Sequence, residues 1–471
     1  MKKLLNSTIL IACLFIGAFN ANAYDFKSNG IYYNINSSDG TVTVTRSDDG
    51  THYTGNVTIP TTVTYNGTTY NVTGIDSWAF NGNSELSSIS IGNKVRTIGY
   101  HAFDGCTHLT SVVIPNSIET MGEGAFFGCT SLENLTIGNT LKVISNSAFE
   151  GCTSLISVTI PGNVETIGSS AFNGCNHLSN LTINEGVVNI NSSAFRDCSI
   201  LPAVRIPNTV KTIGSWAFLY CVEMETLTLG ESLQSIGYHA FDGCSHLKAV
   251  AIPNSTETLD EGAFSGCTSL KNLTIGNTLK VISNSAFEGC TSLISVTIPG
   301  NVETIGSSAF NGCSHLSDLT INEGVVNINS SAFRECSILP AVYLPNTLKT
   351  IGSWAFLNCV EIETLTLGYS VNTIGYAAFS GCDAIKTINS CNETAPVMDN
   401  SNCFTVYTTA NLFIPIGSST SYDNTNYWKK FTSITEKDMG NTGKPKIGDV
   451  DGDGQVSIAD VSALIDIILK K

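Results

Sequence analysis

Charged residues are scarce in this chain. Asp, Glu, Lys and Arg make up 13% of its 471 residues, about half of the roughly 25% found in an average globular protein. Apolar residues nevertheless make up 42%, so the scarcity of charge does not indicate a disordered chain. The charges present are unbalanced, with 39 acidic and 23 basic side chains and a formal net charge of −16. This acidity argues against nucleic acid and anionic membrane surfaces as partners and suits cations or neutral polar partners.

Long apolar runs are absent except at the N-terminus. Two lysines precede the mostly apolar run Leu4–Phe19, and the small-residue motif Ala21–Ala23 follows it. This order is typical of a cleaved secretory signal, which we predict over residues 1–23. A lipoprotein signal ending at Cys13 is an alternative, because Leu10–Cys13 fits a lipobox. Elsewhere no run approaches the ~18 apolar residues of a membrane span, so we expect an exported protein without a transmembrane segment.

Familiar catalytic motifs are also missing. The chain contains no G-x-S-x-G, H-E-x-x-H or G-x-x-x-x-G-K-[ST] sequence, the signatures of a nucleophile elbow, a zinc protease and a phosphate-binding loop. His101 with Asp104 recurs as His239 with Asp242, and we interpret both as surface pairs. We therefore expect that the protein is not an enzyme.

What the chain does contain is an Ala-Phe dipeptide repeated at an unbroken period of 23. Insertions within a coil would break its registry with both neighbours, so this regularity predicts one stack of similar coils rather than several globular domains. The sequence also has a longer period of six coils, because Asn134–Cys175 is identical to Asn272–Cys313. The repeated phenylalanines are Phe80, Phe103, Phe126, Phe149, Phe172, Phe195, Phe218, Phe241, Phe264, Phe287, Phe310, Phe333, Phe356 and Phe379.

A single coil, residues 152–172, shows which local structure the repeat is expected to form. The alternation of Val158, Thr159 and Ile160 predicts a short strand with the threonine facing out. Pro161 and Gly162 then turn the chain. Residues 169–174 are expected to form one helical turn that directs the Ala-Phe dipeptide inward. The fold class is therefore a solenoid with short parallel strands and one helical turn in each 23-residue coil.

The repeat has the pattern C-x-x-L-x-x-[LV]-x-I-P-x-x-V-x-x-I-G-x-x-A-F, which resembles the BspA-like leucine-rich repeats of bacterial surface proteins. The resemblance covers roughly residues 57–390. It implies a leucine-rich repeat solenoid and a role in adhesion or in binding host proteins. Around it we expect a β-rich N-terminal cap over 24–56, a C-terminal cap over 391–436 and a linker over 437–446, because uncapped terminal coils would expose apolar edges.

Thirteen of the sixteen cysteines lie three residues after a repeat phenylalanine, from Cys106 to Cys382. We interpret this column as small buried thiols that fill a narrow corner, rather than as disulfides or a metal array. Cys391 and Cys403 lie outside the column, and a disulfide between them is an open alternative in an exported protein.

The outward strand position carries mostly threonine. One interpretation is structural, because threonine suits a parallel sheet. The other is an extended docking face for a host or cell-surface protein or glycan, as repeat proteins commonly use. Arg205 and Tyr343 interrupt the threonines at equivalent places in the two six-coil blocks and are candidate anchoring residues. The threonines assigned to this face are Thr159, Thr182, Thr297 and Thr320.

The last 25 residues, 447–471, contain a calcium-loop pattern. Ca²⁺ takes six to eight oxygen ligands from a loop that turns sharply at its sixth position, where Gly454 stands. The segment resembles one calcium-binding repeat of a dockerin, although dockerins carry two. The predicted helix 460–469 has an apolar stripe that should dock on a cohesin-like partner, a second copy or the solenoid cap. The candidate Ca²⁺ ligands are Asp449, Asp451, Asp453, Gln455, Ser457 and Asp460, and the stripe is Val461, Leu464, Ile465 and Ile468.

Together these features predict an exported, non-catalytic binding or adhesion protein, secreted or at the surface of a bacterium, with a calcium-dependent docking module. The alternative is an accessory dockerin-type subunit of a polysaccharide-degrading, cellulosome-like assembly.

Overall fold

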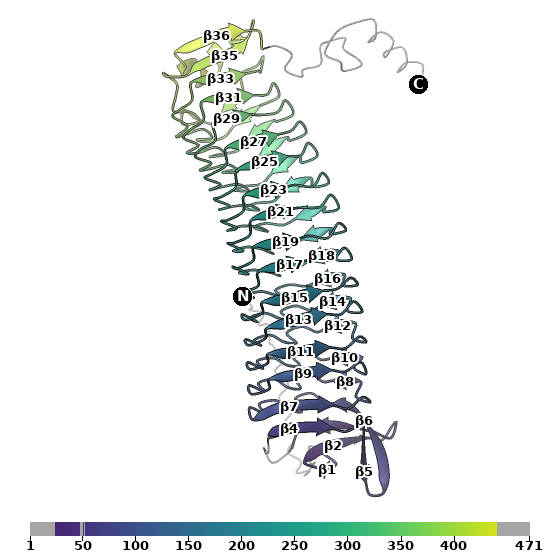
Figure 1. Cartoon of the computed structure of the whole chain (residues 1–471). Helices are drawn as coiled ribbons and strands as arrows, with labels where there is room; N and C mark the ends of the chain where they lie inside the picture. Colours follow the sequence, from purple (N-terminus) through teal and green to yellow (C-terminus); the bar gives the residue numbers. More distant parts are fainter. Residues whose placement is uncertain (1–23, 48–49, 51, 440–471) are drawn as a thin grey trace, which may run out of the picture.

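The computed structural model describes residues 24–47, 50 and 52–439. The coils stack into one elongated, gently curved rod (Figure 1). A typical coil contributes one longer strand and one two-residue strand, which pair in parallel with the equivalent strands of neighbouring coils, although the longer strands are divided into several shorter sheets along the rod. This arrangement confirms the predicted leucine-rich repeat solenoid. Among the described residues, no helix has the length and hydrophobicity of a membrane span.

The longer strands form one side of the rod. Between the Ala-Phe coils their pairing joins residues 23 positions apart, so that Val158 of one coil lies beside Leu181 of the next. The strands are β4 (Gly55–Ile59), β7 (Leu86–Ile91), β9 (Ser111–Ile114), β11 (Asn134–Ile137), β13 (Ser157–Ile160), β15 (Asn180–Ile183), β17 (Ala203–Arg205), β19 (Thr226–Thr228), β21 (Ala249–Ala251), β23 (Asn272–Thr274), β25 (Ser295–Ile298), β27 (Asp318–Ile321), β29 (Ala341–Tyr343), β31 (Thr364–Leu367), β33 (Thr387–Ser390), β35 (Asn411–Pro415) and β36 (Ser433–Lys437).

The two-residue strands form a second side, one turn further along each coil. Their second residue is buried and their first faces outward, as in Thr166 and Ile167. They are β8 (Thr97–Ile98), β10 (Thr120–Met121), β12 (Val143–Ile144), β14 (Thr166–Ile167), β16 (Asn189–Ile190), β18 (Thr212–Ile213), β20 (Ser235–Ile236), β22 (Thr258–Leu259), β24 (Val281–Ile282), β26 (Thr304–Ile305), β28 (Asn327–Ile328), β30 (Thr350–Ile351), β32 (Thr373–Ile374) and β34 (Val397–Met398).

The core is organised around a continuous stack of the repeat phenylalanines. Successive rings lie 4.7–5.7 Å apart and within 15° of parallel, from Phe80 to Phe404. Every ring in this stack is buried. Phe404 adds a fifteenth ring that the period does not reveal, because it follows Phe379 by 25 residues and Cys403 replaces the usual alanine.

The third side of each coil is a run of turns, and the predicted helical turn is wrong. Alternate N–H groups bond back within the coil, such as Asn173 to the Ser170 carbonyl at 3.1 Å. The N–H groups between them bond to the next coil, such as Phe172 to the Ala194 carbonyl at 2.8 Å. Ser170 and Gly174 have positive φ values of 55° and 73°, which interrupts a right-handed helix. The inter-coil ladder therefore extends around this side as well.

Caps close both ends of the stack. At the N-terminus, β1 (Phe26–Ser28), β2 (Ile31–Asn36) and β3 (Thr41–Thr45) are antiparallel, and β3 joins the rod through β6 (Thr68–Ile75), which also pairs with β5 (Thr62–Tyr65). At the C-terminus, helix α1 (Ser419–Asn424) and the 3-10 turn η1 (Trp428–Lys430) bury Tyr422 and Trp428. The Trp428 indole N–H donates to the Pro396 carbonyl at 2.7 Å.

All fifteen cysteines that the structure describes are free thiols. Each of the thirteen column thiols donates to the carbonyl of a phenylalanine one coil earlier at 3.1–3.5 Å. The interpretation of buried, unpaired thiols is confirmed. The Cys391–Cys403 disulfide is not formed, because Cys391 follows β33, whereas the Cys403 thiol donates to Gly375 O at 3.2 Å on the turn side.

Candidate binding surfaces

The outward side chains of the long strands, which we call the strand face, form a regular surface along the rod. Each strand buries every second residue and exposes the residues between. Thr159 lies directly beside Thr182, and Thr297 lies beside Thr320, because the strands pair in register. All four threonines are exposed. Since the register never shifts across these coils, the face presents rows of small polar groups.

Arg205 and Tyr343 project from this face. They end β17 and β29 and lie beside Thr228 and Thr366 respectively. Tyr343 is 62% exposed. The guanidinium of Arg205 lies 3.6 Å from the Glu185 carboxylate, and both side chains remain largely in solvent, so the ion pair contributes at most about 1 kcal/mol. Six coils separate the two residues, roughly 29 Å at the usual strand spacing.

A hollow of about 530 Å³ lies between these two projections, over β19, β21 and β23. Its floor includes Ala249 and Ala251, which stand where neighbouring coils carry larger polar side chains. Pro253 and Asn254 line it as well. This hollow was not predicted from the sequence, although the two alanines in place of larger residues were a signal of it.

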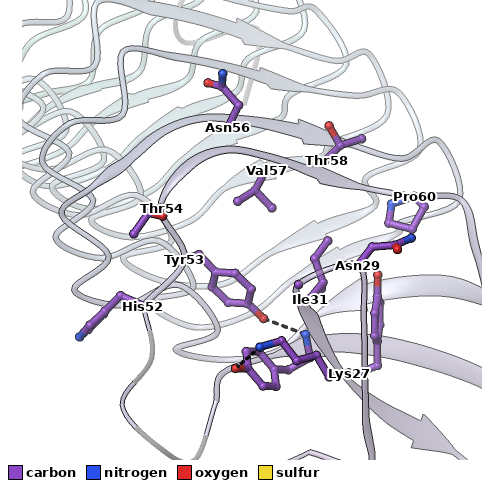
Figure 2. A pocket seen from close by; sticks show the side chains of 13 residues that line it. Lys27, Asn29, Ile31, His52, Tyr53, Thr54, Asn56, Val57, Thr58 and Pro60 are labelled. Atoms are coloured by element: carbon purple, nitrogen blue, oxygen red, sulfur yellow. Dashed lines mark hydrogen bonds between the residues drawn. The ribbon is translucent and has the colours of Figure 1, made fainter.

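The cavity shown in Figure 2, of about 590 Å³, lies at the N-terminal end between β1, β2 and β4. The hydroxyls of Tyr32 and Tyr53 already have hydrogen-bond partners. The Tyr53 hydroxyl donates to the Thr45 carbonyl at 2.6 Å and accepts from the Tyr32 N–H at 3.1 Å, and Lys27 Nζ donates to the Tyr32 hydroxyl at 2.8 Å. Burial raises the pKa of Tyr53 well above its usual range and that of neighbouring Tyr33 to about 12. These phenols stay neutral, and the network serves to close the cap.

Two histidine–aspartate pairs were interpreted as surface pairs. In each, a histidine Nδ1 lies 2.8 Å from an aspartate oxygen, His101 with Asp104 and His239 with Asp242. The His101 ring occupies the space where a side chain on Gly124 would lie, so the imidazole packs over the next coil. Among the residues that the structure describes, no group of three or more His, Cys, Asp or Glu could hold a metal ion.

The predicted signal and calcium loop lie outside the described residues. This applies to every candidate Ca²⁺ ligand from Asp449 to Asp460 and to the apolar stripe Val461, Leu464, Ile465 and Ile468.

Comparison with known proteins identifies the family to which the repeats are similar. The family model for the BspA type leucine-rich repeat region matches residues 73–202, 190–317 and 280–409. No curated protein matches the chain. Among solved structures, a leucine-rich repeat protein from Bacteroides ovatus is 25% identical, with a TM-score of 0.55 over 88% of this chain and 100% of that one. A leucine-rich cell surface protein from Faecalibacterium prausnitzii is 27% identical, with a TM-score of 0.46 over 78% and 94%.

Proposed function

Because the chain belongs to the BspA type leucine-rich repeat family, we propose that it is a non-catalytic binding protein of the bacterial cell surface that docks a host or cell-surface protein or glycan on its strand face. The observation that carries this proposal is the recurrence of exposed side chains at the same positions of the long strands, aligned in register within each run of paired strands. Fourteen coils extend it over roughly 60 Å at the usual strand spacing.

The strand face has the composition that a binding surface needs. Its threonines, serines and asparagines are neutral and supply hydrogen-bond donors and acceptors without a large desolvation cost. Arg205 and Tyr343 are residue types that often dominate binding energy, and the hollow at Ala249 and Ala251 can receive a projecting group. A partner that spans the ~29 Å between Arg205 and Tyr343 would bury an area typical of a stable complex.

Replacing both projecting residues by threonine is expected to weaken partner binding at least tenfold, because truncating an interface hot spot costs about 2 kcal/mol or more. The probe is an array of purified extracellular proteins and glycans, followed by titration of each hit. The double variant R205T/Y343T is compared with V143T/V281T, which changes two equivalent exposed residues on the short strands β12 and β24. Unchanged affinity in R205T/Y343T, or an equal loss in V143T/V281T, would contradict the assignment of the strand face.

We further propose that the loop from Asp449 to Asp460 binds one Ca²⁺ and that Ca²⁺ orders the following helix for docking. Carboxylates at loop positions 1, 3 and 5 and the glycine at position 6 support this proposal. Calorimetric titration of the full chain with CaCl₂ should show one binding event, which the variant D451A/D453A should lose. No heat at millimolar Ca²⁺ would contradict the site.

Capture by a cohesin domain in Ca²⁺ but not in chelator would instead favour the accessory-subunit alternative.

A further inference from the structure

One corner of each of the fourteen Ala-Phe coils has a left-handed backbone. It lies near the start of the turn run, three residues after the short strand, so the short strand on one side and the rest of the turn run on the other separate it from the strand face. Most coils place serine, glycine or histidine at this corner. Three coils place tryptophan there, with φ values of 58–64°. These are Trp78, Trp216 and Trp354, each six coils from the next.

Each tryptophan pairs with a tyrosine from the following coil. The ring centroids are 5.2–5.4 Å apart and the rings are 70–84° to one another. The three aromatic corners, as we call them, are Trp78–Tyr100, Trp216–Tyr238 and Trp354–Tyr376. The backbones of successive coils are locked together by the inter-coil ladder, such as the Trp216 N–H to the Tyr238 carbonyl at 2.8 Å. Each corner is therefore a rigid, preformed pair of perpendicular rings.

The rings of the aromatic corners are not part of the core. Between 37% and 43% of each of the six residues is exposed, whereas the stacked phenylalanines are fully covered. A bulky residue with positive φ is uncommon and strained, and such positions concentrate at functional sites. Serine at the same corner, as at Ser170 and Ser308, supports the fold in other coils. The stacking of coils therefore does not require tryptophan here.

The aromatic residues recur while their surroundings change. The residue two before the tryptophan is Asp76 in one corner and glycine in the others. The residue after the tyrosine is histidine in two corners and Ala377 in the third, and the aspartate bonded to those histidines is replaced by Ser380. What all three corners share is a tryptophan, a tyrosine and the serine preceding the tryptophan, none of which is charged.

We propose that the three aromatic corners bind neutral pyranose rings of one linear polysaccharide. The apolar C–H face of a pyranose packs against an aromatic ring, and its hydroxyls can bond to the tyrosine and serine hydroxyls at its edge. An organic cation fits less well, because the third corner lacks the nearby carboxylate that the first two have. An anionic polymer is disfavoured by the net charge of −16.

The regular spacing points to a repeating ligand rather than a folded protein. One corner is far smaller than the roughly 800 Å² that a protein partner covers in a stable interface. The same Trp–Tyr pair recurs three times along the rod, roughly 29 Å apart by strand spacing, although at the first corner the His101 ring also stacks on Trp78 at 4.6 Å. This recurrence suits a polymer whose identical units can reach more than one corner. Each additional corner engaged then raises the overall affinity without any new kind of contact.

The binding experiment uses tryptophan fluorescence of the full chain. The three corner tryptophans are joined by only one other, Trp428, which is fully buried. The probes are soluble laminarin, xylan, galactomannan and dextran, with polygalacturonate as the anionic control and tetramethylammonium as the cation control. At least one neutral polymer is expected to change the fluorescence, and its short oligosaccharides should bind at least tenfold more weakly.

Matched variants assign the binding to the corners. W78A/W216A/W354A is expected to bind the polymer at least tenfold more weakly by calorimetry, and the single variant W216A is expected to show a smaller loss. Y100F/Y238F/Y376F keeps the rings and removes only hydroxyls, so it remains informative if the alanine variants fail to fold. This variant should retain most binding. Binding of tetramethylammonium or polygalacturonate alone, or wild-type affinity in a folded tryptophan variant, would overturn the proposal.

The test of the aromatic corners and the test of the proposed function can be told apart, because the proposed function concerns the strand face on another side of the rod. R205T/Y343T should bind the polysaccharide normally, and the tryptophan variants should still capture a protein partner on the strand face. If no probe changes the fluorescence while the array yields a partner sensitive to R205T/Y343T, the corner proposal fails and the proposed function stands.

Discussion

Raising the pH above about 9 is expected to unfold the solenoid steeply, because the thiol column cannot ionise while folded. Burial raises the pKa of Cys290 from 9.0 to about 12 and that of Cys221 and Cys267 well above 9.0. Below pH 9 both the folded and the unfolded chain keep these protons, so the thiols do not make stability depend on pH in that range. Between about pH 9 and 12 only the unfolded chain releases them, and stability falls by about 1.4 kcal/mol per pH unit for each thiol.

A cooperative unit of four coils would therefore lose about 5–6 kcal/mol per pH unit, a large part of the 5–15 kcal/mol that stabilises a typical domain. Thermal unfolding followed by circular dichroism at pH 8, 9, 10 and 11, with reductant present, measures the effect. Returning the sample to pH 8 should restore the starting Tm and exclude chemical damage. In C267A/C290A the decline in stability per pH unit above pH 9 should be smaller, by up to the contribution of the two thiols that the substitutions remove. A flat Tm from pH 8 to 10.5, or the same slope in this variant, would contradict a protonated buried column.

The largest mutational effect is expected at the phenylalanine stack. Phe126 is fully buried and stacks on Phe103 at 4.8 Å and Phe149 at 5.4 Å. Phe126→Ala is expected to cost about 3–5 kcal/mol, because it leaves a cavity lined by two rings that cannot move together without breaking registry. The adjacent Phe127 is 37% exposed, so Phe127→Ala removes the same atoms from a site outside the stack and should cost less than about 1 kcal/mol.

Urea unfolding of F126A and F127A measures both values. Limited proteolysis should in addition cut F126A near its own coil, because each coil of a solenoid depends on its two neighbours. Equal destabilisation in the two variants would mean that the stack is not the principal source of stability.

The sequence predicts this fold well because its period is unbroken. An insertion-free spacing of 23 places equivalent residues side by side, so the thiol column and the alternation at Thr159 follow directly from counting. The helical turn was wrong because spacing alone does not reveal that Ser170 adopts a positive φ and directs alternate N–H groups to the next coil. The coil at Phe404 was missed because two extra residues and a cysteine in place of alanine break the pattern.

The candidate surfaces were predicted in part. Arg205 and Tyr343 stand out in sequence because they interrupt a row of threonines. The depth of the hollow at Ala249 depends on side chains from three coils, which no single repeat contains. The aromatic corners depend on a pairing between residues 22 apart, such as Trp216 and Tyr238. This offset differs from the repeat period, so the contact becomes visible only in the folded coil.

Hydroxyl-radical footprinting of the chain, alone and bound to the partner captured on the array, tests the central claim that the strand face is the docking surface. Tyrosine is readily oxidised, and Tyr343 is the most exposed aromatic side chain described. Binding of the partner is expected to protect Tyr343 and peptides containing Arg205, with unchanged oxidation of the short-strand residues Val143 and Val281. Protection of Val143 and Val281 while Tyr343 stays fully reactive would contradict the claim.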